Sequence, residues 1–288
     1  MTEFRQPTTE DAQRLKNILI SSQPRSCDYS AGNLLGWNFC YKENIAFVDG
    51  CLVLRLDEQD LFGFPKGEKY ISALKRITDE FPKCGFYGLE KRECEFIDEL
   101  FPGKYVYKEN RDSFDYVYRR SDLAELKGKK YHSKRNHIAY FEKNNNWSYE
   151  ELTADNFIEC LAMNEKWIVE NIEKDPTGIE KEKIFLDYSL KYYNLLEFKG
   201  GILRSDGKVV AFTFGERLNK NTFVTHYEKA FSSVRGAYPM INMLFARESL
   251  SDYEYINRED DVGSEGLRKA KLSYNPIYLT EKFTAVRI

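Results

Sequence analysis

The fold class follows most directly from residues 201–230, GILRSDGKVVAFTFGERLNKNTFVTHYEKA. It contains three runs rich in β-branched and aromatic residues, at 201–204, 208–217 and 222–230. Asp206-Gly207 separates the first two runs, and an Asp-Gly pair between two strands is a strong hairpin signal. Asn219-Lys220-Asn221 separates the second and third runs. The stretch therefore predicts a three-stranded antiparallel meander.

Helical patterns surround this meander. Apolar residues at helical spacing predict helices over 153–173 and 181–193 before it and over 237–250 after it. A short strand at 253–257 and a short helix at 266–274 follow, and Asn275-Pro276 ends that helix. Residues 277–287 are interpreted as a final strand or pair of strands. The order is helix, helix, meander, glycine turn, helix, strand, helix, strand.

The first half of the chain repeats parts of this pattern. Val48-Asp49-Gly50-Cys51 matches the hairpin at Ser205–Lys208, and Pro65-Lys66-Gly67 precedes a predicted helix as Arg235-Gly236 does. Phe4–Glu10 matches Tyr149–Asp155, each with a threonine at a helix N-cap position. Chance similarity of two α/β segments is the alternative. A duplication predicts two domains, 1–120 and 147–288, joined by a connecting helix within 121–146.

The connecting segment is strongly basic. In KGKKYHSKRNHIAYFEK, residues 127–143, five of the first nine residues are cationic, although the chain carries a net charge of −3. Tyr131, Ile138 and Phe141 fall on one face of a helix over 127–144, which leaves the cations exposed. An anionic partner such as a phosphate would explain them, and a solvated basic helix is the alternative. We expect Lys134 and Arg135 to tolerate replacement without loss of stability.

Composition excludes several classes of protein. Hydrophobic content of 42% with 31% charged residues is typical of a globular chain. Six cysteines without a CxxC pair, together with three histidines, argue against a zinc framework, so no metal is expected. The polar N-terminus and the lack of a long apolar run predict a cytoplasmic protein with at most peripheral membrane contact. Its oligomeric state is left open.

Three groups of motifs carry a family resemblance across nearly the whole chain. They are Phe114–Tyr118 with Leu126–His137; Tyr227–Ala230 with Gly236–Tyr238 and Asn242; and Ile256–Gly263 with Glu265–Lys271 and Tyr274–Pro276. These segments resemble soluble bacterial proteins grouped with the C-terminal domain of phosphatidylglycerol lysyltransferase. The order of elements resembles the GNAT acyltransferase fold, and two tandem copies resemble the Fem-type transferases, which use aminoacyl-tRNA. The resemblance implies an α/β (α+β) class: a tandem duplicated GNAT-like fold of mixed, largely antiparallel sheets flanked by helices.

The candidate site residues follow from charge, position and this resemblance. Gly236 opens a helix directly after a strand, and such helix starts bind phosphate. Carboxylates after the strand at 253–257 could take a proton from an acceptor amine. His226, in mid-strand, is interpreted as a packed core histidine. The predicted catalytic residues are Asp260, Glu259 and Glu228, and the predicted acceptor-binding residues are Asn257 and Asn242. The predicted donor- or phosphate-binding residues are Lys134, Arg135, His137, Gly236, Tyr238, Arg258, Arg268 and Lys271.

Two functions remain open at this point. The first is an acyltransferase or aminoacyltransferase that uses aminoacyl-tRNA or an acyl-CoA-type donor, with direct attack by an amine or hydroxyl acceptor and no required cofactor. The second is a non-catalytic binding module for an anionic metabolite, a nucleotide or a lipid headgroup. Such a binder needs the cations but has no use for an inward-facing Asp260.

Overall fold

The predicted meander forms as three antiparallel strands, β8 (Lys199–Ser205), β9 (Lys208–Arg217) and β10 (Thr222–Ala230). At the first turn Asp206 and Gly207 have φ of 50° and 76°. Asp49 and Gly50 have φ of 51° and 83° between β1 (Asn44–Val48) and β2 (Cys51–Arg55). Two successive positive φ angles are what a type I′ hairpin requires, and this explains why both halves use Asp-Gly.

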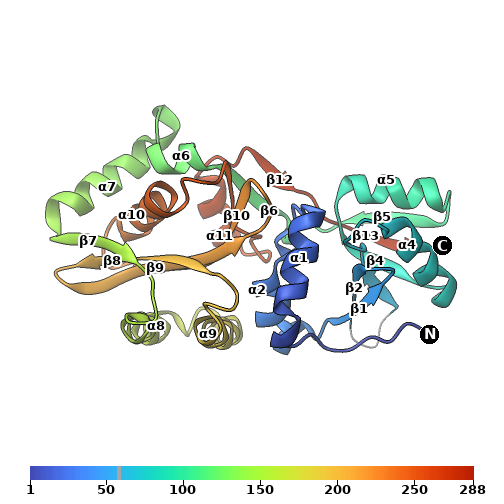
Figure 1. The fold of residues 1–288 in the computed structure, drawn as a ribbon. Helices are drawn as coiled ribbons and strands as arrows, with labels where there is room; N and C mark the ends of the chain where they lie inside the picture. Colours follow the sequence, from blue (N-terminus) through green and yellow to red (C-terminus); the bar gives the residue numbers. More distant parts are fainter. Residues whose placement is uncertain (57–59) are drawn as a thin grey trace.

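The computed structural model describes residues 1–56 and 60–288, and these residues form two sheets in two lobes (Figure 1). The first sheet has six strands in the order β1-β2-β3-β4-β13-β5, and the second has seven in the order β12-β6-β11-β10-β9-β8-β7. The remaining strands are β3 (Leu61–Gly63), β4 (Gly85–Leu89), β5 (Tyr105–Glu109), β6 (Asp115–Arg119), β7 (Trp147–Glu151), β11 (Tyr255–Asn257), β12 (Tyr278–Thr280) and β13 (Phe283–Arg287).

Both halves of the chain build their lobe in the same order. Setting aside β7, which precedes the helices of the second half, each runs through two helices, three strands, a helix, a strand, a helix and a strand, with the short α3 (Asn38–Tyr41) added in the first half. The third and fourth strands of each half are parallel, as β3 with β4 and as β10 with β11. The fold is therefore the tandem GNAT-like α/β fold that the sequence predicts. The helices are α1 (Ala12–Ser22), α2 (Ala31–Gly36), α4 (Tyr70–Glu80) and α5 (Lys91–Leu100) in the first half, and α8 (Phe157–Asn171), α9 (Pro176–Lys191), α10 (Ala237–Leu244) and α11 (Glu265–Leu272) in the second.

The two halves exchange a strand. β6, from the first half, lies between β11 and β12 in the second sheet, and β13, at the end of the chain, lies between β4 and β5 in the first sheet. Strand pairing thus crosses the predicted division into 1–120 and 147–288 in both directions. The predicted final pair of strands exists, but its members belong to different sheets. Alternation marks a strand and its buried face, whereas its neighbour is chosen by tertiary contacts.

A continuous apolar core joins the lobes. Its buried residues come from α1, α2 and β2 on one side and from α8, α9, β8 and β9 on the other. At its edge Trp37 stacks on Phe185 with ring centroids 4.7 Å apart. In Figure 1, α1 and α2 lie between the two sheets. A large shared core of this kind argues for a fixed arrangement of the lobes.

The basic connecting segment packs on the second lobe. It forms two helices, α6 (Arg120–Glu125) and α7 (His132–Asn144), where the sequence predicts one connecting helix. Leu126, with φ of 48°, ends α6, and Gly128 has φ of 91°. Tyr131, Ile138 and Phe141 are buried, as their spacing predicts, and they pack with α10. In the described part of the chain, no helix is long and apolar enough to cross a membrane.

Candidate functional site

The candidate site lies where two parallel strands separate. β10 and β11 pair only at Thr222–Val224 and Tyr255–Asn257. β10 then continues to Ala230, while the chain after Asn257 turns away in a segment that we call the splayed loop, Asn257–Gly263. Within it Glu259 has φ of 57° and Val262 has φ of 45°. Non-glycine residues with positive φ are uncommon and cluster at functional sites. The splayed loop is therefore a candidate for the functional site.

On one side of the splayed loop, Arg258 forms an ion pair with Glu228. The Arg258 Nη2 atom lies 2.8 Å from Glu228 Oε1, and Asn242 Nδ2 donates to Glu228 Oε2 at 3.1 Å. Strand alternation predicts that one of the adjacent charges Glu228 and Lys229 faces inward and needs a partner, with Arg258 or Lys271 as candidates. For Glu228 the partner is Arg258. Arg258 Nη1 and Asn242 Oδ1 are enclosed by protein and have no hydrogen-bond partner among the described residues. We call Arg258, Glu228, Asn242, Lys134 and Tyr274 the arginine cluster.

Lys134 of α7 completes the arginine cluster. Its ammonium lies 3.8 Å from the ring centroid of Tyr274, and the Arg258 guanidinium lies 4.9 Å from the same ring. Lys134 also donates to Ser273 Oγ at 2.7 Å. Burial, with help from the charge of Arg258, lowers the pKa of Lys134 to about 8. Two cations thus face one carboxylate, an arrangement that favours an anionic ligand.

On the opposite side, His226 joins the two lobes. Its side chain is fully buried, with Nδ1 2.8 Å from Glu259 Oε1 and Nε2 3.0 Å from Glu216 Oε1. From α2 of the first lobe, Gly32 N donates to Glu216 at 2.6 Å and Asn33 Nδ2 donates to Glu259 at 2.9 Å. Burial opposes the charge, but the two carboxylates outweigh it and raise the pKa of His226 to about 9. The imidazole is therefore charged at neutral pH.

The interpretation of His226 as a packed core histidine is confirmed only in part. The side chain is buried and packs edge-on against Phe185 and Phe198, as the interpretation requires, but it also contacts two acids. The strand register shifts between Thr225 and Tyr227, and this bulge sends His226 to the same side as its neighbour Tyr227. No local pattern predicts a bulge at this position, and the two acids come from β9 and from the splayed loop, so the contact depends on tertiary structure.

Lys282 forms a second buried link between the lobes. Its ammonium lies 2.8 Å from Asp115 Oδ1 and 2.9 Å from Asp28 Oδ1, and the side chain is 1% exposed. Asn257 Nδ2 donates to Asp115 Oδ2 at 2.8 Å, and Cys27 N donates to the same oxygen at 2.7 Å. Asn257 is thus held in a structural network, and its predicted contact with an acceptor stays a prediction.

Asp260 differs from the other acids of the splayed loop. Its Oδ1 accepts from Val262 N at 3.2 Å, and no Lys or Arg in the described residues forms an ion pair with it. Burial raises the pKa of Asp260 to about 7; Lys282 opposes the rise, while Asp115, Asp28 and Glu259 add to it. A carboxyl group that titrates near neutral pH is suited to take up a proton.

Two of the predicted donor-binding cations lie beneath the splayed loop. Arg268 Nη2 lies 2.8 Å from Asp261 Oδ1 and 2.8 Å from Asp112 Oδ1. Burial of the Asp261 carboxyl group raises its pKa, but hydrogen bonds from Arg268 and Tyr116 outweigh this and hold the pKa of Asp261 well below its usual range. Lys271 is buried and donates to the backbone carbonyls of Arg258 and Asp260. The two cations fix the loop's shape, and their contact with a donor stays a prediction.

At the expected phosphate site, Gly236 packs closely against α7. Gly236 has φ of 92°, and a Cβ there would lie 2.2 Å from the carbonyl oxygen of His137. Close packing of the two helices therefore explains the glycine without a ligand. Tyr238 packs against the apolar cluster shared by α7 and α10. Arg135 Nη1 donates to the carbonyls of Leu126 and Gly128, so this cation points at backbone and not outward as the sequence suggests.

The structure thus separates Lys134 from Arg135, and we expect their variants to behave differently. Arg135→Met should lower the free energy of unfolding by about 1 kcal/mol, because two carbonyls lose a partly exposed donor. Lys134→Met should change it by about 0.5 kcal/mol or less. It should weaken the binding of an anionic donor, and this loss should shrink as salt rises. Urea unfolding and salt-dependent titrations measure both. A larger stability loss for Lys134→Met than for Arg135→Met would contradict this division.

In the described ranges, no group of three or more His, Cys, Asp or Glu side chains could hold a metal ion. The cysteines are unpaired. Burial raises the pKa of the Cys27 thiol well above its usual range and that of Cys160 to about 12, so neither is a ready nucleophile. The chemistry of the site rests on carboxylates, cations and His226.

Comparisons with known proteins agree with the fold. A conserved protein of unknown function from Bacteroides thetaiotaomicron is 37% identical, with full coverage of both chains and a TM-score of 0.94. A C-terminal domain assigned to a lysylphosphatidylglycerol synthetase of Agrobacterium fabrum is 15% identical, covering 97% of this chain and 92% of that domain, with a TM-score of 0.67. An uncharacterized protein of Mycoplasmoides gallisepticum is 23% identical over 207 residues, which are 66% of this chain and 61% of the length of that relative.

Residues 21–286 match the family described as phosphatidylglycerol lysyltransferase, C-terminal. The match spans both lobes and the strand exchange, so it concerns the whole architecture and not one motif. The family is described by a lysyltransferase, and the Agrobacterium fabrum domain shares the fold. The chain belongs to the family of the phosphatidylglycerol lysyltransferase C-terminal domain.

Proposed function

We propose that this protein transfers an acyl or aminoacyl group to an amine or hydroxyl acceptor by direct attack, with Asp260 as the general base. The observation that carries the proposal is Asp260 itself. It sits on a loop with strained backbone, has no ion-pair partner in the described structure, and has its pKa raised to about 7. A base is most effective when its pKa lies near the working pH.

The steps follow from ordinary acyl-transfer chemistry. Asp260 takes a proton from the acceptor ammonium or hydroxyl, and the freed lone pair attacks the carbonyl carbon of the donor. As the tetrahedral intermediate collapses, the bond to the donor's ribose oxygen or thioester sulfur breaks. With an amine acceptor, the leaving group takes up the second proton of the attacking nitrogen, and Asp260 releases the first proton to solvent. With a hydroxyl acceptor, the leaving group takes up the proton that Asp260 removed. The buried, protonated thiols of Cys27 and Cys160 support direct attack over a covalent enzyme intermediate. His226 acts as a positioning residue, since it holds Glu259 beside Asp260.

Two observations favour an aminoacyl donor over an acyl-CoA-type donor. The family description names a lysyltransferase. In addition, the start of α10, where a coenzyme A pyrophosphate would be expected, is closely packed against α7 at Gly236. The arginine cluster would then hold an anionic part of the donor through Lys134 and Arg258.

The test compares donors directly. The full chain is incubated with labelled aminoacyl-tRNAs or labelled acyl-CoA and with amine acceptors, and both product formation and the melting temperature are measured. We expect turnover with an aminoacyl-tRNA and an increase in melting temperature with the same donor, because a bound ligand stabilises the folded state. Stabilisation by a donor or headgroup without turnover would support the binding-module alternative. No response to any donor would refute the proposal.

A further inference from the structure

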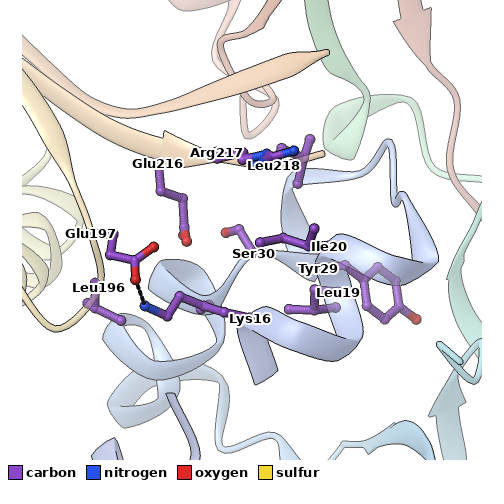
Figure 2. Close-up of a pocket in the computed structure, with 11 residues that line it drawn as sticks. Lys16, Leu19, Ile20, Tyr29, Ser30, Leu196, Glu197, Glu216, Arg217 and Leu218 are labelled. Atoms are coloured by element: carbon purple, nitrogen blue, oxygen red, sulfur yellow. Dashed lines mark ion pairs between the residues drawn. The ribbon is translucent and has the colours of Figure 1, made fainter. Parts of the chain in front are cut away.

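A small pocket lies between the lobes, away from the arginine cluster. It has a volume of about 80 Å³ and is bounded by α1 and α2 of the first lobe and by the end of β9 and residues 196–197 of the second. Figure 2 shows its side chains: Lys16 and Glu197 at one end, Glu216 and Ser30 facing the middle, and apolar groups such as Leu19 at the other end. Both charged and apolar side chains therefore line one pocket.

Glu216 presents an unused oxygen to this pocket. Its side chain is 5% exposed, and Oε1 accepts from Gly32 N and lies 3.0 Å from His226 Nε2. Among the described residues Oε2 has no hydrogen-bond partner, and it is not among the side-chain atoms sealed from solvent. Figure 2 shows the carboxylate pointing into the pocket. This carboxylate oxygen is therefore reachable from the pocket and free to accept a hydrogen bond from a ligand.

The other side of the pocket offers donors. The Lys16 side chain is 8% exposed, and Nζ lies 2.7 Å from Glu197 Oε1 and 3.0 Å from Leu195 O. An ammonium has three hydrogens, so one remains after these two contacts. Ser30 Oγ accepts from Asn33 N at 3.3 Å, which leaves its own hydroxyl hydrogen free to donate. The pocket thus combines a vacant acceptor with two vacant donors.

We propose that this pocket binds a small zwitterion, with its ammonium on Glu216 and its carboxylate on Lys16 and Ser30. A simple cation would be repelled by Lys16, and a simple anion would be repelled by Glu216. One water-sized atom takes up about 15 Å³ of pocket volume. The pocket of about 80 Å³ therefore holds about five non-hydrogen atoms. Glycine and alanine have this size and charge pattern. This binding proposal does not depend on the proposed acyl transfer, and its test is independent of that activity.

Occupation of the pocket is linked to the splayed loop through existing contacts. Glu216 binds His226, His226 binds Glu259, and Glu259 precedes Asp260. The lining residues come from both lobes, so a ligand adds contacts across their interface. Binding should therefore raise the melting temperature of the whole chain.

Calorimetric titration of the full chain tests the proposal. Glycine and L-alanine are compared with methylamine, which has only the ammonium, and with acetate, which has only the carboxylate. A five-atom ligand gains at most about 1.5 kcal/mol per atom, so we expect dissociation constants in the micromolar to millimolar range. We expect at least about tenfold weaker binding of methylamine and acetate, and of the bulky L-tryptophan. Equal binding of acetate or methylamine, or no saturable heat with either amino acid, would overturn the proposal.

Two variants localise the site. Ile20→Phe adds volume at the half-buried edge of the pocket and should abolish glycine binding while the protein stays folded. Ile71→Phe, an equal change at an exposed position on α4, is the matched control and should bind as the wild type does. Glu216→Gln should weaken binding about tenfold through loss of the charge. If Glu216→Gln does not fold, Ile20→Phe decides alone, and unchanged glycine binding in Ile20→Phe would refute the assignment.

Discussion

Replacing Lys282 with methionine is expected to lower the free energy of unfolding by about 3–5 kcal/mol. The Lys282 side chain is 1% exposed and lies between Asp115 and Asp28, and the Asp115 side chain is fully buried. Methionine fills most of the same space, so the loss comes from leaving the Asp115 carboxylate in the interior without its cation. The residue sits where the chain passes from β12 in one sheet to β13 in the other, so the damage should reach both lobes. Urea unfolding followed by circular dichroism gives the free energy.

The matched control is another lysine with two acidic partners at the surface. Lys183 is 39% exposed and lies 3.1 Å from both Glu165 and Asp187. Lys183→Met should cost less than about 1 kcal/mol, because solvent screens exposed pairs. The double variant Lys282→Met with Asp115→Asn should recover part of the loss, since it removes the uncompensated charge. A cost for Lys282→Met no greater than for Lys183→Met would show that the buried network contributes little.

Asp260→Asn is expected to reduce turnover by about 10²–10⁴-fold if Asp260 is the general base. Asparagine has the same shape but accepts no proton, so donor binding and fold should be kept. In the wild type the pKa of Asp260 is raised to about 7, and the group acts as a base only when ionised. kcat/KM should therefore fall about tenfold per pH unit below pH 7, and the residual activity of the variant should lack this dependence. Initial rates across pH 5–9 measure both.

Stability gives an independent check on the same group. A carboxyl whose pKa is raised on folding contributes stability that is present below its ordinary pKa near 4 and is lost as the pH rises through about 7. Unfolding free energies of the wild type should therefore decline between about pH 4 and pH 7, and Asp260→Asn should flatten this slope. Glu43→Gln is a useful control. Burial raises the pKa of Glu43 to about 7 as well, but its carboxylate is bonded to Tyr87 at 2.6 Å, so its variant should flatten the slope without the same loss of turnover. Full activity of Asp260→Asn would place the base elsewhere.

Local patterns in the sequence were enough to predict the hairpins, the helices and the buried face of α7. Asp-Gly pairs with positive φ set both hairpins, and the spacing of Tyr131, Ile138 and Phe141 set the buried face of α7. Alternation along β10 also predicted that one of the adjacent charges Glu228 and Lys229 faces inward and needs a partner, and Arg258 is that partner for Glu228. These features depend on residues near one another in the chain or on a single period, so they can be read directly.

Only the tertiary structure decided how the halves are joined and where the candidate site lies. The exchange of β6 and β13, the contact of His226 with Glu216 and Glu259, and the Lys282 link to Asp115 and Asp28 connect residues far apart in sequence. The predicted cations were divided in the same way: Arg135 and Lys271 bond backbone carbonyls, while Lys134 and Arg258 share Tyr274. Charge and residue type are properties of the sequence. The partner that each charge meets, and hence its pKa and its role, is fixed by burial and by strand order, which no local pattern encodes.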